Sequence, residues 1–189
     1  MYLYQPCLLI LSLCAWAFCD KNDGRRWRKI LFPLGILAIS WWELRFARIT
    51  VYPAALLLLI PFLPLGRRFA AWAEVLTAAL IGGFLSWKAA DTWPLFAGMT
   101  LLSAVLLYIA TIPLCRDGMD RRLACALGGL FYELFFCLKE YTLFAFCVIR
   151  LCSRESLSLT AAALCLAAIH EQMRQELNER EKRTVPIGN

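Results

Sequence analysis

The sequence predicts an all-α protein, a polytopic transmembrane helical bundle of about seven spans (six to eight) with a charged helical C-terminal tail. Three observations predict it. Of the 189 residues, 61% are hydrophobic and 18% are charged, with a mean hydropathy of +0.62. Long uncharged stretches recur along the whole chain, and basic residues gather at alternate boundaries between them. One core of this size cannot enclose so much apolar surface, so we expect lipid as its solvent.

The spans follow from the positions of the charged residues. A helix needs about 20 apolar residues to cross a hydrocarbon layer of about 30 Å. Uncharged stretches that reach or approach this length cover 1–19, 49–66 and 92–115. The shorter stretch 30–42 qualifies when Trp27 and the Trp41-Trp42 pair are counted as interfacial belts, and 156–170 is the last span. Two further segments qualify if one acid is allowed in each, namely 69–87 and 123–138.

The C-terminal third is predicted to contain one long helix. No Gly or Pro follows Gly129 until after Cys152, so nothing in the sequence favours a hairpin. On a helix, the charged residues of this segment fall within an arc of about 120°. These are Glu133, Lys139, Glu140, Arg150 and Arg154. We therefore expect a single tilted helix with a polar stripe, and then a final helix capped by Ser156.

The chain divides into two parts on this interpretation. Residues 1–170 form the transmembrane helical bundle, and residues 171–189 form a charged helical tail that ends in a short disordered terminus. Charges of opposite sign alternate at helical spacing in the tail, as in Glu171/Arg174 and Glu176/Arg180.

The distribution of basic residues predicts the orientation. Arg-Arg pairs at 25–26, 67–68 and 121–122 precede alternate spans, which places those connections in the cytoplasm. The N-terminus is then outside, the C-terminus is cytoplasmic, and the protein is a multi-pass protein of the cell membrane. This topology explains the net charge of +6, so no nucleic-acid partner is expected.

No catalytic, metal or cofactor site is predicted. The nine cysteines lie mostly in apolar stretches and form no Cys-x-x-Cys pair, and His170 is the sole histidine. Ser-His and Cys-His arrangements therefore lack a base within the predicted spans. The sequence indicates a protein that is not an enzyme and has no cofactor.

The candidate polar site consists of Glu133, Glu74 and Arg150. An ionisable group in hydrocarbon is costly, at least about 2.5 kcal/mol at the centre, so it requires a partner or a wet cavity. Glu133 is the deeper acid; it is interpreted either as a proton or cation site, or as the structural partner of a basic residue such as Lys139, Arg45 or Arg150.

Small residues four apart predict close helix packing. The pairs Ala78/Gly82 and Ala79/Gly83 lie in the segment 69–87, and Ala124/Gly128 lies in 123–138. Packing within one chain is favoured over a dimer interface, and the oligomeric state stays open. A membrane-protein partner could bind through these helix faces or through the tail.

In length, outward N-terminus, Arg-Arg-led helices and charged tail, the chain resembles the YphA family, small polytopic membrane proteins of endospore-forming bacteria. The resemblance implies a non-enzymatic structural or assembly role in the cell envelope, associated with sporulation. An alternative is a small transport component, because the compact bundle with a buried acid also resembles the substrate-binding subunits of energy-coupling-factor transporters.

Overall fold

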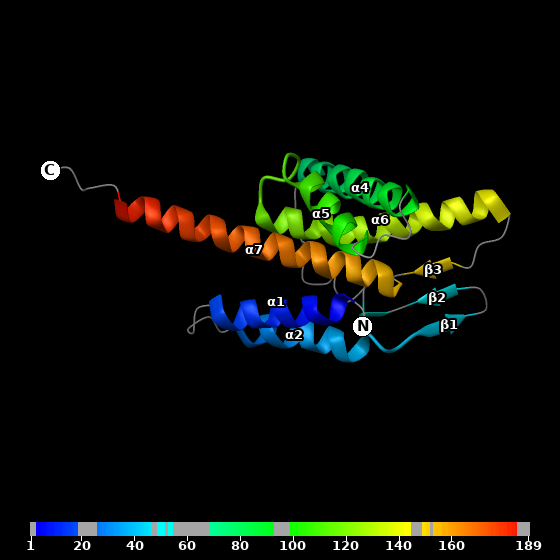
Figure 1. Ribbon diagram of the computed structural model, residues 1–189, viewed down its shortest axis with the longest axis horizontal. Helices are drawn as coiled ribbons and strands as arrows, with labels where there is room; N and C mark the ends of the chain where they lie inside the picture. Colours follow the sequence, from blue (N-terminus) through cyan, green and yellow to red (C-terminus); the bar gives the residue numbers. More distant parts are fainter. Residues whose placement is uncertain are drawn as a thin grey trace.

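The fold was obtained as a computed structural model, which describes residues 3–18, 26–46, 49–51, 53–54, 69–92, 99–144, 149–151 and 153–184 (Figure 1). These residues form helices and three short strands. In chain order they are α1 (Tyr4–Phe18), α2 (Arg26–Ile39), β1 (Leu44–Phe46), β2 (Ile49–Val51), α4 (Phe69–Thr92), α5 (Met99–Thr111), α6 (Gly118–Phe144), β3 (Ile149–Leu151) and α7 (Arg154–Thr184).

Helix α7 is the centre of the arrangement. It lies between the α1–α2 pair on one side and the group formed by α4, α5 and α6 on the other (Figure 1). The larger hydrophobic core joins these layers, and Leu8, Leu107 and Leu157 are almost completely buried in it. The Cys165 thiol also donates a hydrogen bond of 3.0 Å to the backbone oxygen of Cys7, which ties α7 to α1.

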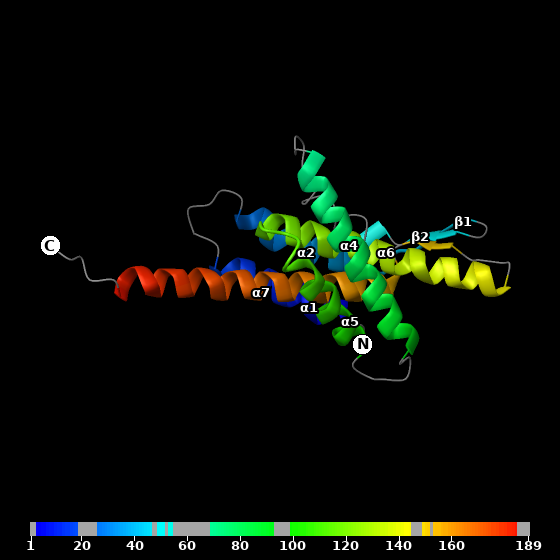
Figure 2. The same cartoon turned by 90° about the horizontal axis from the view of Figure 1, so that it is seen from above.

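Helix α4 crosses α6 at a steep angle and packs against both α5 and α6 (Figure 2). A second core of small and medium side chains, including Val75, Ala79 and Leu123, fills the contact between α4 and α6. The α4–α5 contact is closed by two hydrogen bonds: the Ser86 hydroxyl donates to the Ser103 carbonyl at 2.7 Å, and the Ser103 hydroxyl donates to the Ser86 carbonyl at 3.3 Å.

Within the described residues the fold is all-α, as predicted, apart from a small sheet of three-residue strands. Strand β2 pairs with β1 in antiparallel register and with β3 in parallel register, with Thr50 opposite Arg150. The prediction of one continuous helix from Gly129 past Cys152 was therefore wrong, because α6 ends at Phe144 and the chain pairs as β3 from Ile149. The β-branched Ile49, Thr50 and Val51 of β2 favour an extended backbone.

The seven-span transmembrane bundle was also wrong. Within the described ranges, no helix has both the length and the apolar character that crossing a bilayer requires. Helices α1, α2 and α5 have 15, 14 and 13 residues, which corresponds to roughly 20 Å at 1.5 Å per residue. The longer helices include charged residues, as in α4 with Glu74, Lys88 and Asp91.

Other predictions depended on those spans. The cell-membrane localisation, with an outward N-terminus and a cytoplasmic C-terminus, was wrong for the same reason, and the sporulation association is not supported. The predicted stretch 49–66 lies outside the described residues except for 49–51 and 53–54.

The C-terminal helix has a different start from the one predicted. The Ser156 backbone N–H donates to the Ser153 hydroxyl at 3.2 Å, and the Leu157 N–H donates to the Ser153 carbonyl at 2.9 Å. Ser153, rather than Ser156, is therefore the N-cap. From there α7 continues for 31 residues across the predicted boundary between 170 and 171.

Candidate functional site

Glu133 lies on α6, is 6% exposed, and accepts a hydrogen bond from the Ser153 backbone N–H at the start of α7. The first backbone N–H groups of a helix have no partner inside the helix, and the helix dipole favours a negative charge there. The carboxylate therefore satisfies a part-buried donor and fixes the start of α7 against α6.

The partners proposed for Glu133 are placed elsewhere or are not described. The Lys139 ammonium forms an ion pair with the Asp91 carboxylate, which links α6 to the end of α4. The side chains of Arg45 and Arg150 lie outside the described part of the structure, although the backbone of Arg150 belongs to β3. Glu74 is exposed on α4, so the structure does not bring the three candidate polar residues together in one site.

The small-residue pairs lie where α4, α5 and α6 meet. Ala78, Ala79 and Ala124 are fully buried. A β-carbon added to Gly83 would lie 2.8 Å from the Gly128 carbonyl oxygen, and one added to Gly82 would lie 2.6 Å from Leu107 Cδ1. All six predicted packing residues thus lie at contacts between helices of the same chain. Gly128 approaches Leu107 and Ala79 closely.

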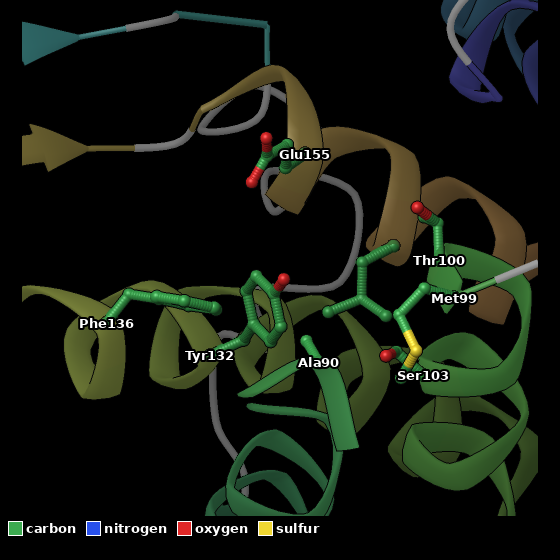
Figure 3. A pocket seen from close by; sticks show the side chains of 8 residues that line it. Ala90, Met99, Thr100, Ser103, Tyr132, Phe136 and Glu155 are labelled. Atoms are coloured by element: carbon green, nitrogen blue, oxygen red, sulfur yellow. The ribbon is translucent and has the colours of Figure 1, made fainter. Parts of the chain in front are cut away.

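A cavity of about 310 Å³ opens beside the start of α7. Four helices form its walls: Ala90 comes from α4, three residues from α5, two from α6 and two from α7 (Figure 3). The residues that line it are Ala90, Met99, Thr100, Ser103, Tyr132, Phe136, Glu155 and Leu159. Cavities of this size stand at the lower end of small-molecule sites, which begin near 300 Å³.

Tyr132 gives this cavity a neutral polar wall. The side chain is 8% exposed, and burial raises the pKa of its phenol, with further increases from the nearby Glu155 and Glu133 carboxylates. Its ring packs edge-on against Phe136, with the centroids 5.0 Å apart. The phenol therefore keeps its proton over the ordinary pH range and can donate a hydrogen bond into the cavity.

A second polar cluster joins α5, α6 and α7, and none of its residues lines the cavity. The Tyr108 hydroxyl and His170 Nδ1 share a hydrogen bond of 2.6 Å, and the neighbouring Glu171 carboxylate forms an ion pair with Arg122. Burial is the main cause that raises the pKa of Tyr108. The sole histidine thus has a partner on another helix, and the cluster fastens the middle of α7.

Cys125 is a buried thiol of α6 whose titration opposes folding at high pH. It is 0% exposed, and burial raises its pKa from the ordinary value of 9.0 to about 12, with a smaller opposing effect from a hydrogen bond to Thr111. The stabilisation from the neutral thiol is complete below pH 9 and is lost as the pH rises towards 12.

We expect the free energy of unfolding to fall between pH 9 and 10, with a limit of about 1.4 kcal/mol per pH unit for one group. Tyr108 and Tyr132, whose pKa values are also raised, add to the fall as the pH approaches 10 and do so equally in the variants compared. Urea unfolding at pH 8, 9 and 10 measures this slope. The slope should be smaller in C125A, whereas the half-buried control C137A should keep it. Equal slopes in C125A and the unmodified chain would contradict the assignment.

The sequence reasoning missed Ser153, Glu155, Tyr132 and the Tyr108–His170 contact. Ser153 followed by Glu155 is an ordinary signal for a helix start, so the cap could have been found. The Tyr108–His170 pair joins residues 62 positions apart, and the cavity joins residues up to 69 positions apart, on different helices, so no local spacing encodes them.

Comparison with known proteins finds no matching family model, no matching curated protein and no matching solved structure. The resemblance to the YphA family therefore stays a prediction.

Proposed function

We propose that the protein is a non-enzymatic assembly protein that pairs with a second copy of itself through the outer face of α4. The observation that carries the proposal is the pattern of exposure along that helix. Its inner side is built from buried small residues, whereas its outer face presents large apolar side chains that are each more than 40% exposed. This outer face consists of Leu76, Leu80, Ile81, Phe84 and Leu85.

An apolar helix face of this kind favours a protein partner. Helices that are apolar on all sides are normally covered on all sides, and contiguous exposed apolar surface is typical of interaction sites. The five side chains recur at spacings of one, three and four residues, so they lie together on one side of α4.

Charge complementarity selects a second copy as the partner. Glu74 and Lys88 are both exposed and stand at opposite ends of the outer face, about 21 Å apart along the helix. Ile81 lies seven residues from each of them (81 − 74 = 88 − 81). An antiparallel pair of α4 helices centred on Ile81 therefore places each Glu74 opposite the other copy's Lys88, as a two-fold interface requires.

The interactions of three candidate reactive residues favour a role other than catalysis. Glu133 is engaged at the helix start, His170 is hydrogen-bonded to Tyr108, and the raised pKa of Cys125 disfavours a nucleophilic thiolate.

The oligomeric state tests the proposal. Analytical ultracentrifugation of the full chain over a concentration series should show a reversible dimer. In I81K two ammonium groups meet at the two-fold axis, so we expect the dimer dissociation constant to rise at least about tenfold. The control I109K makes the same change at a side chain of α5 that is 52% exposed, and its dimer should persist.

A charge exchange tests the antiparallel arrangement. Both E74K and K88E should weaken the dimer about 3- to 30-fold, because each breaks two symmetric surface ion pairs. The double variant E74K/K88E restores opposite charges and should regain most of the affinity. A chain that is monomeric at every concentration, or a dimer that I81K leaves intact, contradicts the proposal.

A further inference from the structure

The cavity beside the start of α7 has one kind of charge on its walls. Of the eight lining residues, Glu155 is the ionisable acid and none is Lys, Arg or His. The lining hydroxyls belong to Thr100, Ser103 and Tyr132. Figure 3 shows Glu155 on one side of the cavity, on the first turn of α7, with Tyr132 and Ser103 on the other side.

The local electrostatic balance favours a cation. The start of a helix carries about half a positive charge from its dipole. Among the described residues, the carboxylates of Glu155 and Glu133 both raise the pKa of Tyr132, so their negative charge reaches the cavity wall. The guanidinium of Arg154, the nearest basic residue in sequence, lies over the Trp41 ring at 5.7 Å, and Arg154 is not among the lining residues.

The remaining walls favour an organic body on that cation. Met99, Phe136 and Leu159 are apolar, and the Tyr132–Phe136 pair offers aromatic rings to a positive charge. A volume of about 310 Å³ exceeds that of a cavity known to hold benzene, about 150 Å³, and leaves room for a short substituent. A metal ion is less suited, since one lining carboxylate supplies too few ligands.

We infer that this cavity is a binding site for a small organic ammonium compound, whose charged group meets Glu155 while its apolar body lies against Met99, Tyr132, Phe136 and Leu159. The Thr100 and Ser103 hydroxyls can accept further N–H hydrogen bonds from the ammonium group. This site is separate from the outer face of α4, so its test is independent of self-association.

Four probes of matched shape test the charge selectivity. Isothermal titration calorimetry of the full chain should give a dissociation constant at or below about 1 mM for benzylammonium and for benzyltrimethylammonium. Benzyl alcohol, which is neutral, should bind at least about tenfold more weakly, and benzoate should not bind. No binding of either ammonium probe at 10 mM, or benzoate binding as tightly, overturns the inference; so does calcium chloride at about 1 mM displacing benzylammonium.

Two variants place the site. E155Q removes the charge from an exposed position and should weaken benzylammonium binding at least about tenfold while changing benzyl alcohol binding little. The control E176Q makes the same change at an exposed residue farther along α7 and should leave both affinities unchanged. A90F fills the cavity from its α4 wall and should abolish binding of all the probes. Equal effects of E155Q and E176Q, or undiminished binding to A90F, overturn the assignment.

Discussion

G83A is expected to lower the free energy of unfolding by about 1–3 kcal/mol, the range typical of overpacked cores. The new methyl group would lie 2.8 Å from the Gly128 carbonyl oxygen, 2.8 Å from Phe131 Cβ and 3.1 Å from the Tyr132 backbone nitrogen. Two of these atoms belong to the backbone of α6, so a change of side-chain rotamer cannot relieve the contact. The α4–α6 crossing must open, and chemical denaturation followed by circular dichroism measures the loss.

A matched glycine separates this contact from helix propensity. Gly35 lies within α2, and a β-carbon added there would meet no atom within 4 Å. Alanine is favoured over glycine in a helix by about 0.5–1 kcal/mol, so G35A should be neutral or stabilising. A loss of stability of the same size in G35A and G83A would mean that the α4–α6 contact is not the cause.

E133A should cost about 1–3 kcal/mol, because it removes a buried carboxylate and leaves the part-buried Ser153 N–H at the start of α7 without this acceptor. E133Q keeps an oxygen that can accept the same hydrogen bond but loses the charge, so its loss should be smaller. The measurement is again the free energy of unfolding in urea. Unfolding of α7 should also begin at lower denaturant in E133A, which hydrogen exchange of its first turn reports.

The exposed acid of α4 is the control for this comparison. E74A removes an exposed carboxylate, and at protein concentrations low enough for the chain to be monomeric its stability should change by less than about 0.5 kcal/mol. A loss of stability that is largest in E133A, smaller in E133Q and smallest in E74A distinguishes a specific contact at the start of α7 from a general effect of negative charge. Equal effects of all three substitutions would remove Glu133 from the support of α7.

The helices were largely predictable from the sequence, but their setting was not. Uncharged stretches gave the approximate positions of α1, α2, α5 and α7, because apolar runs of more than about ten residues favour helices. The apolar composition then suggested that these helices cross a lipid bilayer, because composition alone does not show where each helix ends. Helix α5 stops at Thr111 although the uncharged stretch runs from 92 to 115, and the described helix has 13 residues.

The strands could not be recognised because they depend on distant partners. Ile149–Leu151 continues an apolar pattern that suits a helix equally well, and a three-residue strand is too short to show an alternating pattern. The cavity also depends on tertiary structure. Its eight lining residues come from four helices, so no window of sequence contains them.

Strand β3 has a consequence for the order in which the chain folds. It aligns beside β2 with Thr50 opposite Arg150, a separation of 100 residues (150 − 50). Closing so long a loop costs conformational entropy. The few backbone hydrogen bonds of β3 offset little of this cost until the intervening helices have packed together. The α4–α5–α6 contacts join near neighbours and form early, so the sheet closes last. During synthesis, a nascent chain shorter than about 150 residues lacks β3, so the edge of β2 that β3 covers in the finished fold has no partner strand.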